Sequence, residues 1–138
     1  MSNIIDFNLY LITDRTQVAS GHTLFSTLES ALQGGVKAVQ LREKDLSATE
    51  LLPLAQELRE LTRRYDARFF INDNIDIALA VHADGVHLGG HSRPTNFIRE
   101  KIGHDLLIGV STHSKAEIRL AADQGADFVT FGPVYATP

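Results

Sequence analysis

The chain has 138 residues, of which 43% are hydrophobic, and its formal net charge is −4. This length allows one sizeable core, so we expect a single globular domain over residues 1–138. No basic tract is longer than Arg63-Arg64, which argues against nucleic acid and against an anionic membrane surface as partners. The chain has no cysteine and no uncharged apolar run of membrane-spanning length, and these features favour a cytoplasmic protein without disulfides.

Short apolar runs alternate with stretches of helical periodicity along the whole chain. Six runs rich in Val, Ile and Phe are predicted to be strands, at residues 8–13, 35–41, 68–72, 84–88, 106–110 and 127–131. Five helices are predicted between them, at residues 24–32, 47–62, 75–81, 94–102 and 114–122. Ser47 and Ser114 each precede a glutamate by three residues, which is the spacing of a helix-opening capping box. The alternation of strands and helices predicts an α/β fold built on a parallel sheet.

Polar side chains stand at the end of every predicted strand, and this pattern bears on the choice between a closed barrel and an open sheet. The polar groups are Asp14-Arg15, Gln40 to Lys44, Asn72-Asp73, His87, Ser111 to His113 and, just past the sixth strand, Thr137. A (β/α)8 TIM barrel places functional groups from all its strands at one face, whereas an open sheet gathers them at one switch point. The chain also lacks the Gly-x-Gly-x-x-Gly loop of nucleotide-binding open sheets. We therefore expect a (β/α)8 barrel.

The chain is too short to complete such a barrel. Eight strand-helix units of this size need about 200 residues, and the pattern stops after six strands and five helices. We expect a barrel truncated before strands 7 and 8, as a piece of a longer protein. The alternative is a natural short form that closes by pairing with another chain. In either case the exposed strand edges and core surface predict self-association of the truncated chain.

Residues 39–45, Val-Gln-Leu-Arg-Glu-Lys-Asp, change from a buried strand into a charged loop. A period of two along this segment sends the side chains of Gln40, Arg42 and Lys44 to one side. An arginine fork and a lysine point charge at that spacing can bind a phosphate together. The alternative interpretation of the same residues is a solvated strand end.

Six motifs resemble, in order and position, those of the superfamily of thiamine phosphate synthases and TenI-type thiazole tautomerases. They are Leu-Tyr-Leu-Ile-Thr-Asp-Arg (9–15), Val-Gln-Leu-Arg-Glu-Lys-Asp (39–45), Phe-Ile-Asn-Asp-Asn (70–74), Asp-Gly-Val-His-Leu-Gly (84–89), Gly-Val-Ser-Thr-His-Ser (109–114) and Gly-Ala-Asp-Phe-Val-Thr-Phe-Gly-Pro (125–133). The resemblance covers the whole chain and implies a (β/α)8 barrel. It also implies a transferase of thiamine biosynthesis that joins hydroxymethylpyrimidine diphosphate to a thiazole phosphate, with release of diphosphate and assistance from Mg²⁺.

The resemblance further implies a role for individual side chains. Matches to diphosphate-binding positions are found at Gln40, Arg42, Lys44 and Asn72. Arg42 and Lys44 would also act catalytically, because positive charge there stabilises the leaving group. Asp73 matches a magnesium ligand, Ser111 a residue near the pyrimidine and the diphosphate, and Thr137 the start of the loop that binds the thiazole phosphate. Helix capping is the alternative role for Asn72-Asp73 and for residues 111–114.

One position departs from the synthase pattern. Where synthases carry a second aspartate ligand for magnesium, this chain has Ser92, a weak neutral donor. His91 beside it could bind a metal, although a lone loop histidine is more often solvent-exposed.

That departure leaves two other functions open. TenI-type tautomerases share the barrel, lack the full pair of magnesium ligands and move a proton on a thiazole carboxylate phosphate. Their acid-base histidine matches His113, and imidazole suits proton transfer near neutral pH. The other possibility is a non-catalytic regulator that binds a thiazole or pyrimidine phosphate without turnover.

Overall fold

Six strands and five helices alternate along residues 5–138, the part of the chain that the computed structural model describes. The strands are β1 (Leu11–Ile12), β2 (Ala38–Leu41), β3 (Arg68–Asn72), β4 (Gly85–Leu88), β5 (Leu107–Thr112) and β6 (Phe128–Phe131). The helices are α1 (Leu24–Gln33), α2 (Ala48–Arg64), α3 (Ile75–Ala80), α4 (Thr95–Ile102) and α5 (Lys115–Asp123), and a short 3-10 helix, η1, spans Arg15–Gln17. Neighbouring strands pair in parallel, in the order β1-β2-β3-β4-β5-β6. The predicted α/β class and the alternation of its elements are confirmed.

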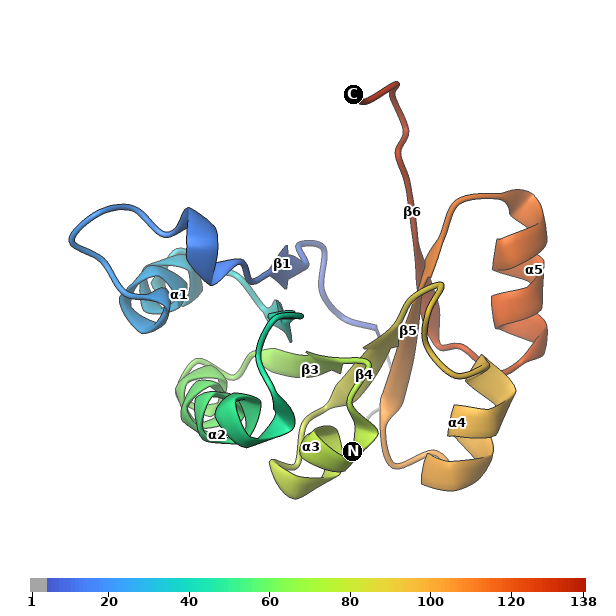
Figure 1. Ribbon diagram of the computed structural model, residues 1–138, viewed down its shortest axis with the longest axis horizontal. Helices are drawn as coiled ribbons and strands as arrows, with labels where there is room; N and C mark the ends of the chain where they lie inside the picture. Colours follow the sequence, from blue (N-terminus) through green and yellow to red (C-terminus); the bar gives the residue numbers. More distant parts are fainter. Residues whose placement is uncertain (1–4) are drawn as a thin grey trace.

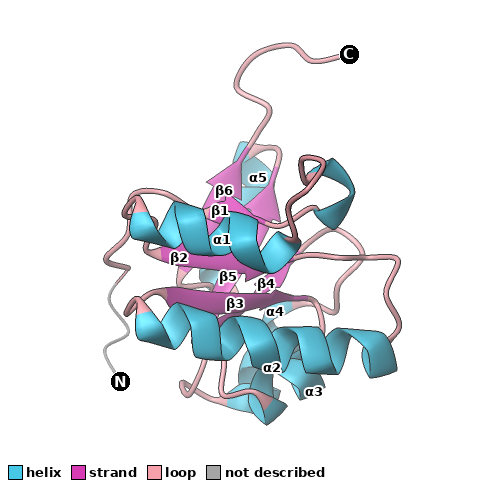
Figure 2. Ribbon diagram, turned by 90° about the vertical axis from the view of Figure 1, so that its left-hand side faces the viewer, coloured by secondary structure: helices cyan, strands magenta, loops and turns pink. Residues whose placement is uncertain are grey.

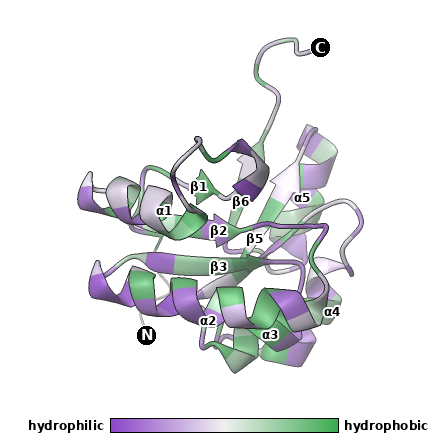
Figure 3. Ribbon diagram, turned by 60° about the vertical axis from the view of Figure 1, so that its left-hand side comes forward, coloured by the Kyte–Doolittle hydropathy of each residue, from purple (hydrophilic) through white to green (hydrophobic). Residues whose placement is uncertain are grey.

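The sheet curves into half of a barrel, with the helices on its outer, convex side (Figures 1 and 2). β1 and β6 are its two edge strands. In Figure 3 helix α2 shows alternating hydrophobic and hydrophilic stripes. The buried stripe of α2 packs on the sheet and includes Leu51, Ala55, Leu58 and Leu61. Among residues 5–138, no helix is both long enough and apolar enough to cross a bilayer.

The first two strands are shorter than the sequence predicts. β1 contains two residues instead of residues 8–13, because within the described chain it pairs only with β2. β2 begins at Ala38 instead of residue 35. The backbone N–H groups of Gly35 and Val36 donate to carbonyls of helix α1 at 3.0 and 3.1 Å, so these two residues close the helix and cannot join the sheet.

β5 is longer than predicted, because Ser111 and Thr112 continue the pairing with β6. The predicted helix starts at Ser47 and Ser114 are confirmed. The hydroxyl of Ser47 accepts a hydrogen bond from the Glu50 N–H at 3.2 Å, and that of Ser114 accepts one from the Glu117 N–H at 3.1 Å. Thr112 is also tied to β6, because its hydroxyl donates to the Thr130 carbonyl at 2.8 Å.

The two faces of the sheet bury different kinds of side chain. Alternate strand residues such as Val39 and Ile71 face the helices and belong to the large core between helices and sheet. The concave face carries a second cluster at the beginnings of the strands, formed by Ala38, Phe70 and Leu107 with Phe7, Tyr10 and Phe128 packed against it. Further along the strands, the concave positions are polar. The half-barrel is therefore aromatic at one end of its concave face and polar at the other.

Two glycines make room for the rings of the concave cluster. A Cβ atom at Gly85 would lie 2.6 Å from the Phe70 ring, and one at Gly109 would lie 2.4 Å from the Phe128 ring and 2.8 Å from the His87 Nδ1 atom. Contacts this short cannot be accommodated by a side chain. The aromatic rings and His87 can therefore lie across the sheet only because these two concave positions have no side chain.

The same arginine-aspartate clamp occurs twice at the amino ends of the strands. Asp84 precedes β4, and its Oδ2 atom accepts hydrogen bonds from Arg59 of α2 at 2.8 Å and from the Phe69 N–H at 2.7 Å. Asp127 precedes β6, and its Oδ2 atom accepts from Arg99 of α4 at 2.6 Å and from the Ile108 N–H at 2.8 Å. Each clamp joins a helix to two neighbouring strands.

We expect the Asp84→Asn substitution to lower the free energy of unfolding by about 3 kcal/mol, because the Arg59 guanidinium would remain buried without its counter-charge. Urea unfolding followed by circular dichroism measures this change. Glu60→Gln is the matched control, since it breaks the exposed Arg63–Glu60 pair and should change stability by less than about 1 kcal/mol. Equal effects of the two substitutions would contradict a stabilising role for the clamp.

Candidate functional site

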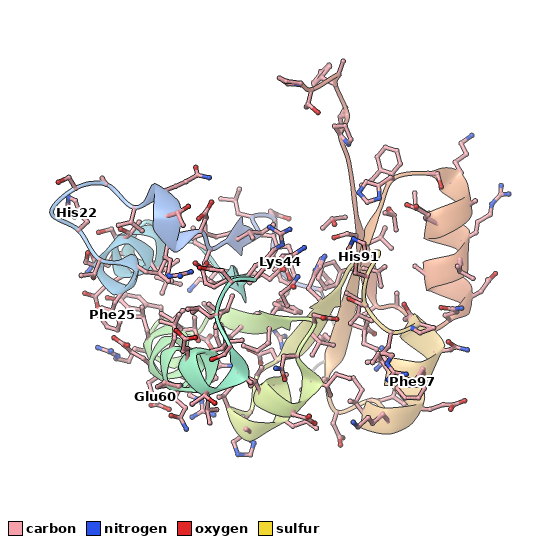
Figure 4. All side chains as sticks on the ribbon, viewed as in Figure 1. His22, Phe25, Lys44, Glu60, His91 and Phe97 are labelled. Atoms are coloured by element: carbon pink, nitrogen blue, oxygen red, sulfur yellow. The ribbon has the colours of Figure 1, made fainter. Side chains whose placement is uncertain are left out.

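A cavity of about 710 Å³ lies where the strands end, and it is bounded by the loops that follow β2, β3, β4 and β5. Its lining includes Arg42, Lys44, Asn72, Asp73, His91, Ser92, Ser111 and His113. The structure therefore brings most of the predicted site residues together from four separate loops. Figure 4 labels Lys44 and His91, which come from the loops after β2 and β4.

The loop after β2 presents two cations to this cavity. Although β2 ends at Leu41, the alternation of the sequence continues into the loop, and Arg42 and Lys44 are exposed while Glu43 is only 7% exposed. The Thr13 hydroxyl holds both the backbone and the buried carboxylate of this loop. It accepts a hydrogen bond from the Arg42 N–H at 3.0 Å and donates one to Glu43 Oε2 at 2.6 Å.

Arg15 neutralises the two acidic residues of the same loop. Its Nη1 atom donates to Glu43 at 3.2 Å, and its Nη1 and Nη2 atoms donate to Asp45 at 2.7 and 2.5 Å. The hydrogen bond from Arg15 lowers the pKa of Asp45, and the bonds to Asp45 and Glu43 raise the pKa of Arg15. Within the described residues, Arg42 and Lys44 have no acidic partner of their own. The cavity therefore has two unneutralised cations on this side.

Sequence reasoning did not assign this supporting role to Thr13, Arg15 and Glu43. The signal was present in the alternation of basic and acidic residues in the segment 42–45 and in the polar end of the first strand. What the sequence alone did not show was that the two strand ends lie side by side, with the Thr13 N–H donating to the Gln40 carbonyl at 3.0 Å.

The end of β3 contributes an amide and a carboxylate. The Asn72 Nδ2 atom donates to Gln40 Oε1 at 2.9 Å. Asp73 has a φ of 63°, a left-handed conformation that aspartate tolerates, and its N–H donates to the His87 carbonyl at 2.9 Å. Helix α3 is capped instead by Asn74, whose Oδ1 atom accepts from the Ile77 N–H at 3.0 Å. Capping therefore does not account for Asn72 or Asp73, and both remain available to the cavity.

The loop after β4 is closed by Ser92. Its Oγ atom accepts a hydrogen bond from the Gly89 N–H at 2.9 Å, and its own N–H donates to the Gly89 carbonyl at 3.0 Å. His91 is exposed in the same loop. No group of three or more His, Cys, Asp or Glu side chains suited to a metal ion occurs in residues 5–138. A metal here would have Asp73 as its carboxylate ligand, because the other carboxylate in the lining, Glu43, is engaged by Thr13 and Arg15.

The loop after β5 adds a hydroxyl and an imidazole. Ser111 lies at the end of the concave face, 2.9 Å from the His87 Nε2 atom. His113 is exposed, and its Nδ1 atom lies 3.2 Å from the Glu117 carboxylate, which also accepts a hydrogen bond from the His113 N–H. Ser114 caps α5, as predicted, and takes no part in the cavity lining.

His87 is buried beneath the cavity and was noted from the sequence only as a polar strand end. Its Nδ1 atom lies 3.0 Å from the Tyr10 hydroxyl, and its ring packs against Tyr10 and Phe128. Burial lowers the pKa of His87 to about 4, with a smaller contribution from the positive charge of Arg42. Burial also raises the pKa of Tyr10. Both groups are therefore neutral at physiological pH.

Two predicted site residues do not line the cavity. Gln40 is only 1% exposed and lies below it, where it contacts the cavity through Asn72. Thr137 is exposed on the segment that follows β6 and extends away from the sheet in Figure 1.

Comparison with known proteins places these residues in a family. The model of a family described as thiamine monophosphate synthase matches residues 9–138. Over 134 residues the chain is 58% identical to a Geobacter sulfurreducens protein named "Putative thiamine-phosphate synthase", and the match covers 97% of this chain and 62% of that relative. It is 42% identical over 136 residues to the thiamine-phosphate synthase of Alkaliphilus oremlandii, covering 99% of this chain and 65% of the relative.

A solved structure agrees with these matches. The thiamine phosphate pyrophosphorylase from Pyrococcus furiosus superposes with a TM-score of 0.86 at 40% identity, over 95% of this chain and 62% of that protein. The chain thus spans less than two thirds of the length of these relatives. The family match and the relatives' identity show that the chain belongs to the thiamine monophosphate synthase family.

Proposed function

We propose that the protein works as a thiamine-phosphate synthase, joining hydroxymethylpyrimidine diphosphate to a thiazole phosphate and releasing diphosphate. The observation that carries the proposal is the pair of cations, Arg42 and Lys44, that face the cavity while Arg15 neutralises the acidic residues between and beside them. An unneutralised Arg and Lys form a binding site for a diphosphate. Membership of the thiamine monophosphate synthase family supports this choice of substrate.

In this proposal the two cations do chemical work as well as binding. Negative charge grows on the leaving diphosphate as its bond to the pyrimidine methylene carbon breaks, and Arg42 and Lys44 stabilise that charge. Asn72 uses one amide hydrogen for Gln40 and has a second for a diphosphate oxygen. Gln40 acts by holding the Asn72 amide in place. Ser111 contributes its hydroxyl at the opposite side of the cavity.

The residues present fit a Mg²⁺ ion that takes most of its ligands from diphosphate and water. Mg²⁺ is commonly held by one or two carboxylates together with substrate phosphates, and Asp73 supplies one exposed carboxylate. Bound there, Mg²⁺ would neutralise diphosphate charge. Ser92 cannot supply a second carboxylate, and its oxygen already accepts a hydrogen bond from Gly89. We therefore propose that Asp73 binds Mg²⁺ weakly in the absence of diphosphate.

A second candidate function is proton transfer on a thiazole carboxylate phosphate, as in TenI-type tautomerases. The observation that favours it is the pairing of His113 with Glu117 at the cavity, since the carboxylate can hold a proton on Nδ1 and leave Nε2 free as a base. The absence of the second carboxylate at Ser92 points in the same direction.

We also propose that the described half-barrel is part of a (β/α)8 barrel in a cytoplasmic protein whose partners are small phosphorylated molecules. The relatives are longer than this chain. At the two edges of the sheet, Ile12 of β1 is 47% exposed and Phe131 of β6 is 51% exposed. Val134 and Tyr135 beyond β6 are also exposed apolar residues.

The 138-residue chain by itself would then self-associate through these edges, and its sedimentation coefficient would show this.

We expect Arg42→Ala and Lys44→Ala each to weaken binding of hydroxymethylpyrimidine diphosphate to the full-length protein by at least about tenfold, because a charge-assisted hydrogen bond contributes roughly 1.5 to 3 kcal/mol. Titration calorimetry measures the affinity. Arg63→Ala, on the outer surface of α2, is the control and should leave it unchanged. Unchanged affinity in the Arg42 and Lys44 variants would remove the two cations from the site.

We expect Ser92→Asp to tighten Mg²⁺ binding on the order of tenfold, because it adds a second carboxylate at the cavity. Ser92→Asn is the matched control. Both side chains can accept the Gly89 N–H as Ser92 does, and only aspartate adds charge. Calorimetric titration of Mg²⁺ in the presence of diphosphate distinguishes them. If the two variants bind Mg²⁺ equally, Ser92 does not face the metal and the proposed metal position is wrong.

Removal of metal separates the two candidate reactions. With EDTA, diphosphate release by a synthase should be lost, whereas a tautomerase that relies on His113 needs no metal and should keep its rate. The His113→Ala substitution should have the opposite effect: it should abolish thiazole isomerisation and leave diphosphate release in place. Assays of both reactions on the full-length protein give the answer. Isomerisation that survives EDTA and fails in His113→Ala, with no diphosphate release in either case, would replace the synthase assignment. Binding without either reaction would indicate a regulator.

A further inference from the structure

A row of buried and half-buried polar side chains crosses the concave face beneath the cavity. Its members are Asn72, Gln40, Tyr10, His87 and Ser111, which come from β3, β2, the segment before β1, β4 and β5. The Asn72 amide lies 2.9 Å from Gln40, the Tyr10 hydroxyl 3.0 Å from His87, and His87 2.9 Å from Ser111. Burial raises the pKa of Tyr10, and the neighbouring Gln40 side chain lowers it. Both ends of the row, Asn72 and Ser111, line the cavity.

The direction of donation follows from the phenol of Tyr10. Its single hydrogen needs an acceptor, and the His87 Nδ1 atom lies at 3.0 Å from its oxygen. A phenol hydrogen left without an acceptor among the surrounding aromatic rings would be costly. Tyr10 therefore donates to an unprotonated Nδ1 atom.

The second hydrogen bond of His87 follows from the burial of the imidazole, which is 2% exposed and has the hydroxyls of Tyr10 and Ser111 beside its two nitrogens, so a charged ring would be costly. A neutral histidine carries one ring hydrogen, and when Nδ1 accepts from Tyr10 this hydrogen is on Nε2. Nε2 therefore donates to Ser111 Oγ. The Thr130 hydroxyl donates to the same oxygen at the longer distance of 3.4 Å. With both lone pairs of Ser111 Oγ occupied by donors, the Ser111 hydroxyl hydrogen is left for a group in the cavity.

We propose that His87 is a positioning residue that, through its Nε2–H group and with Tyr10 behind it, makes Ser111 a hydrogen-bond donor to an anionic oxygen of the substrate. The ligand chemistry is a diphosphate oxygen, so this inference rests on the proposed function. The close packing around the ring supports it. Gly109 leaves space beside Nδ1, and Tyr10 and Phe128 pack against the imidazole, so the ring cannot turn over without displacing its neighbours.

The tautomer of His87 is directly measurable. In full-length protein with ¹⁵N-labelled histidine and no substrate, we expect His87 to be neutral with a bare Nδ1 and a protonated Nε2. The signal is assigned by its disappearance in His87→Gln. In Tyr10→Phe, where no hydroxyl donates to Nδ1, we expect the other tautomer to become populated. A wild-type His87 protonated on Nδ1, or cationic at neutral pH, would overturn the proposal, whatever the enzyme's reaction proves to be.

Two substitutions of His87 test the consequence for binding. The terminal amide of glutamine can place its nitrogen near the position of Nε2, whereas that of asparagine is one bond shorter and reaches only near Nδ1. We expect His87→Gln to keep the affinity for inorganic diphosphate within about threefold, and His87→Asn to lose about tenfold, the contribution of one hydrogen bond to a charged group. Titration calorimetry on the full-length protein measures both.

A double-mutant cycle separates positioning from general disruption of the fold. If His87 acts through Ser111, His87→Asn should have almost no further effect on diphosphate affinity in a Ser111→Ala background. Additive effects would show that His87 acts in some other way and would overturn the proposal. Failure of wild-type protein to bind inorganic diphosphate would instead overturn the proposed function, and the tautomer measurement would then decide the direction of the hydrogen-bond chain by itself.

Discussion

The contacts of Arg15 with Glu43 and Asp45 support the whole site. This arginine follows β1, the two carboxylates follow β2, and the Thr13 hydroxyl joins the same cluster. The cluster does two things at once. It ties the edge strand β1, whose ladder has only two residues, to the rest of the sheet. It also neutralises the negative charge of the β2 loop, so that the charge of Arg42 and Lys44 is available to a ligand.

Stability and binding are separated along the length of the strands. At the amino ends, the arginine-aspartate clamps and the aromatic cluster hold helices and strands together. At the carboxyl ends, the concave positions become polar and open into the cavity. A parallel sheet permits this separation because all its strands point the same way, so the same end of each strand reaches the same face of the molecule.

Between these two ends, the buried His87 ring lies at hydrogen-bond distance from the hydroxyls of Tyr10 and Ser111. The ring nitrogens of His87 are bonded to neighbouring side chains, and one of those neighbours, Ser111, lines the cavity. A buried polar group is costly if it is left unsatisfied, so these hydrogen bonds favour a single arrangement of the ring. Tyr10 and His87 fill the space that Gly109 and the aromatic rings leave between them.

The sequence by itself determined the α/β class, the number and order of the elements, and the loops that carry the site, because periodicity, capping residues and strand-end polarity are local signals. It did not determine where β1 and β2 begin, since strand pairing and the capping of α1 by Gly35 and Val36 depend on neighbours in space. Only the tertiary structure showed that Asn74 is the cap of α3 and that Asn72 and Asp73 are not. Likewise, Gln40 and His87 are buried partners beneath the cavity, and Arg15 neutralises a loop some 30 positions away. Burial and hydrogen bonding between distant segments decide these roles, and no pattern of neighbouring residues encodes them.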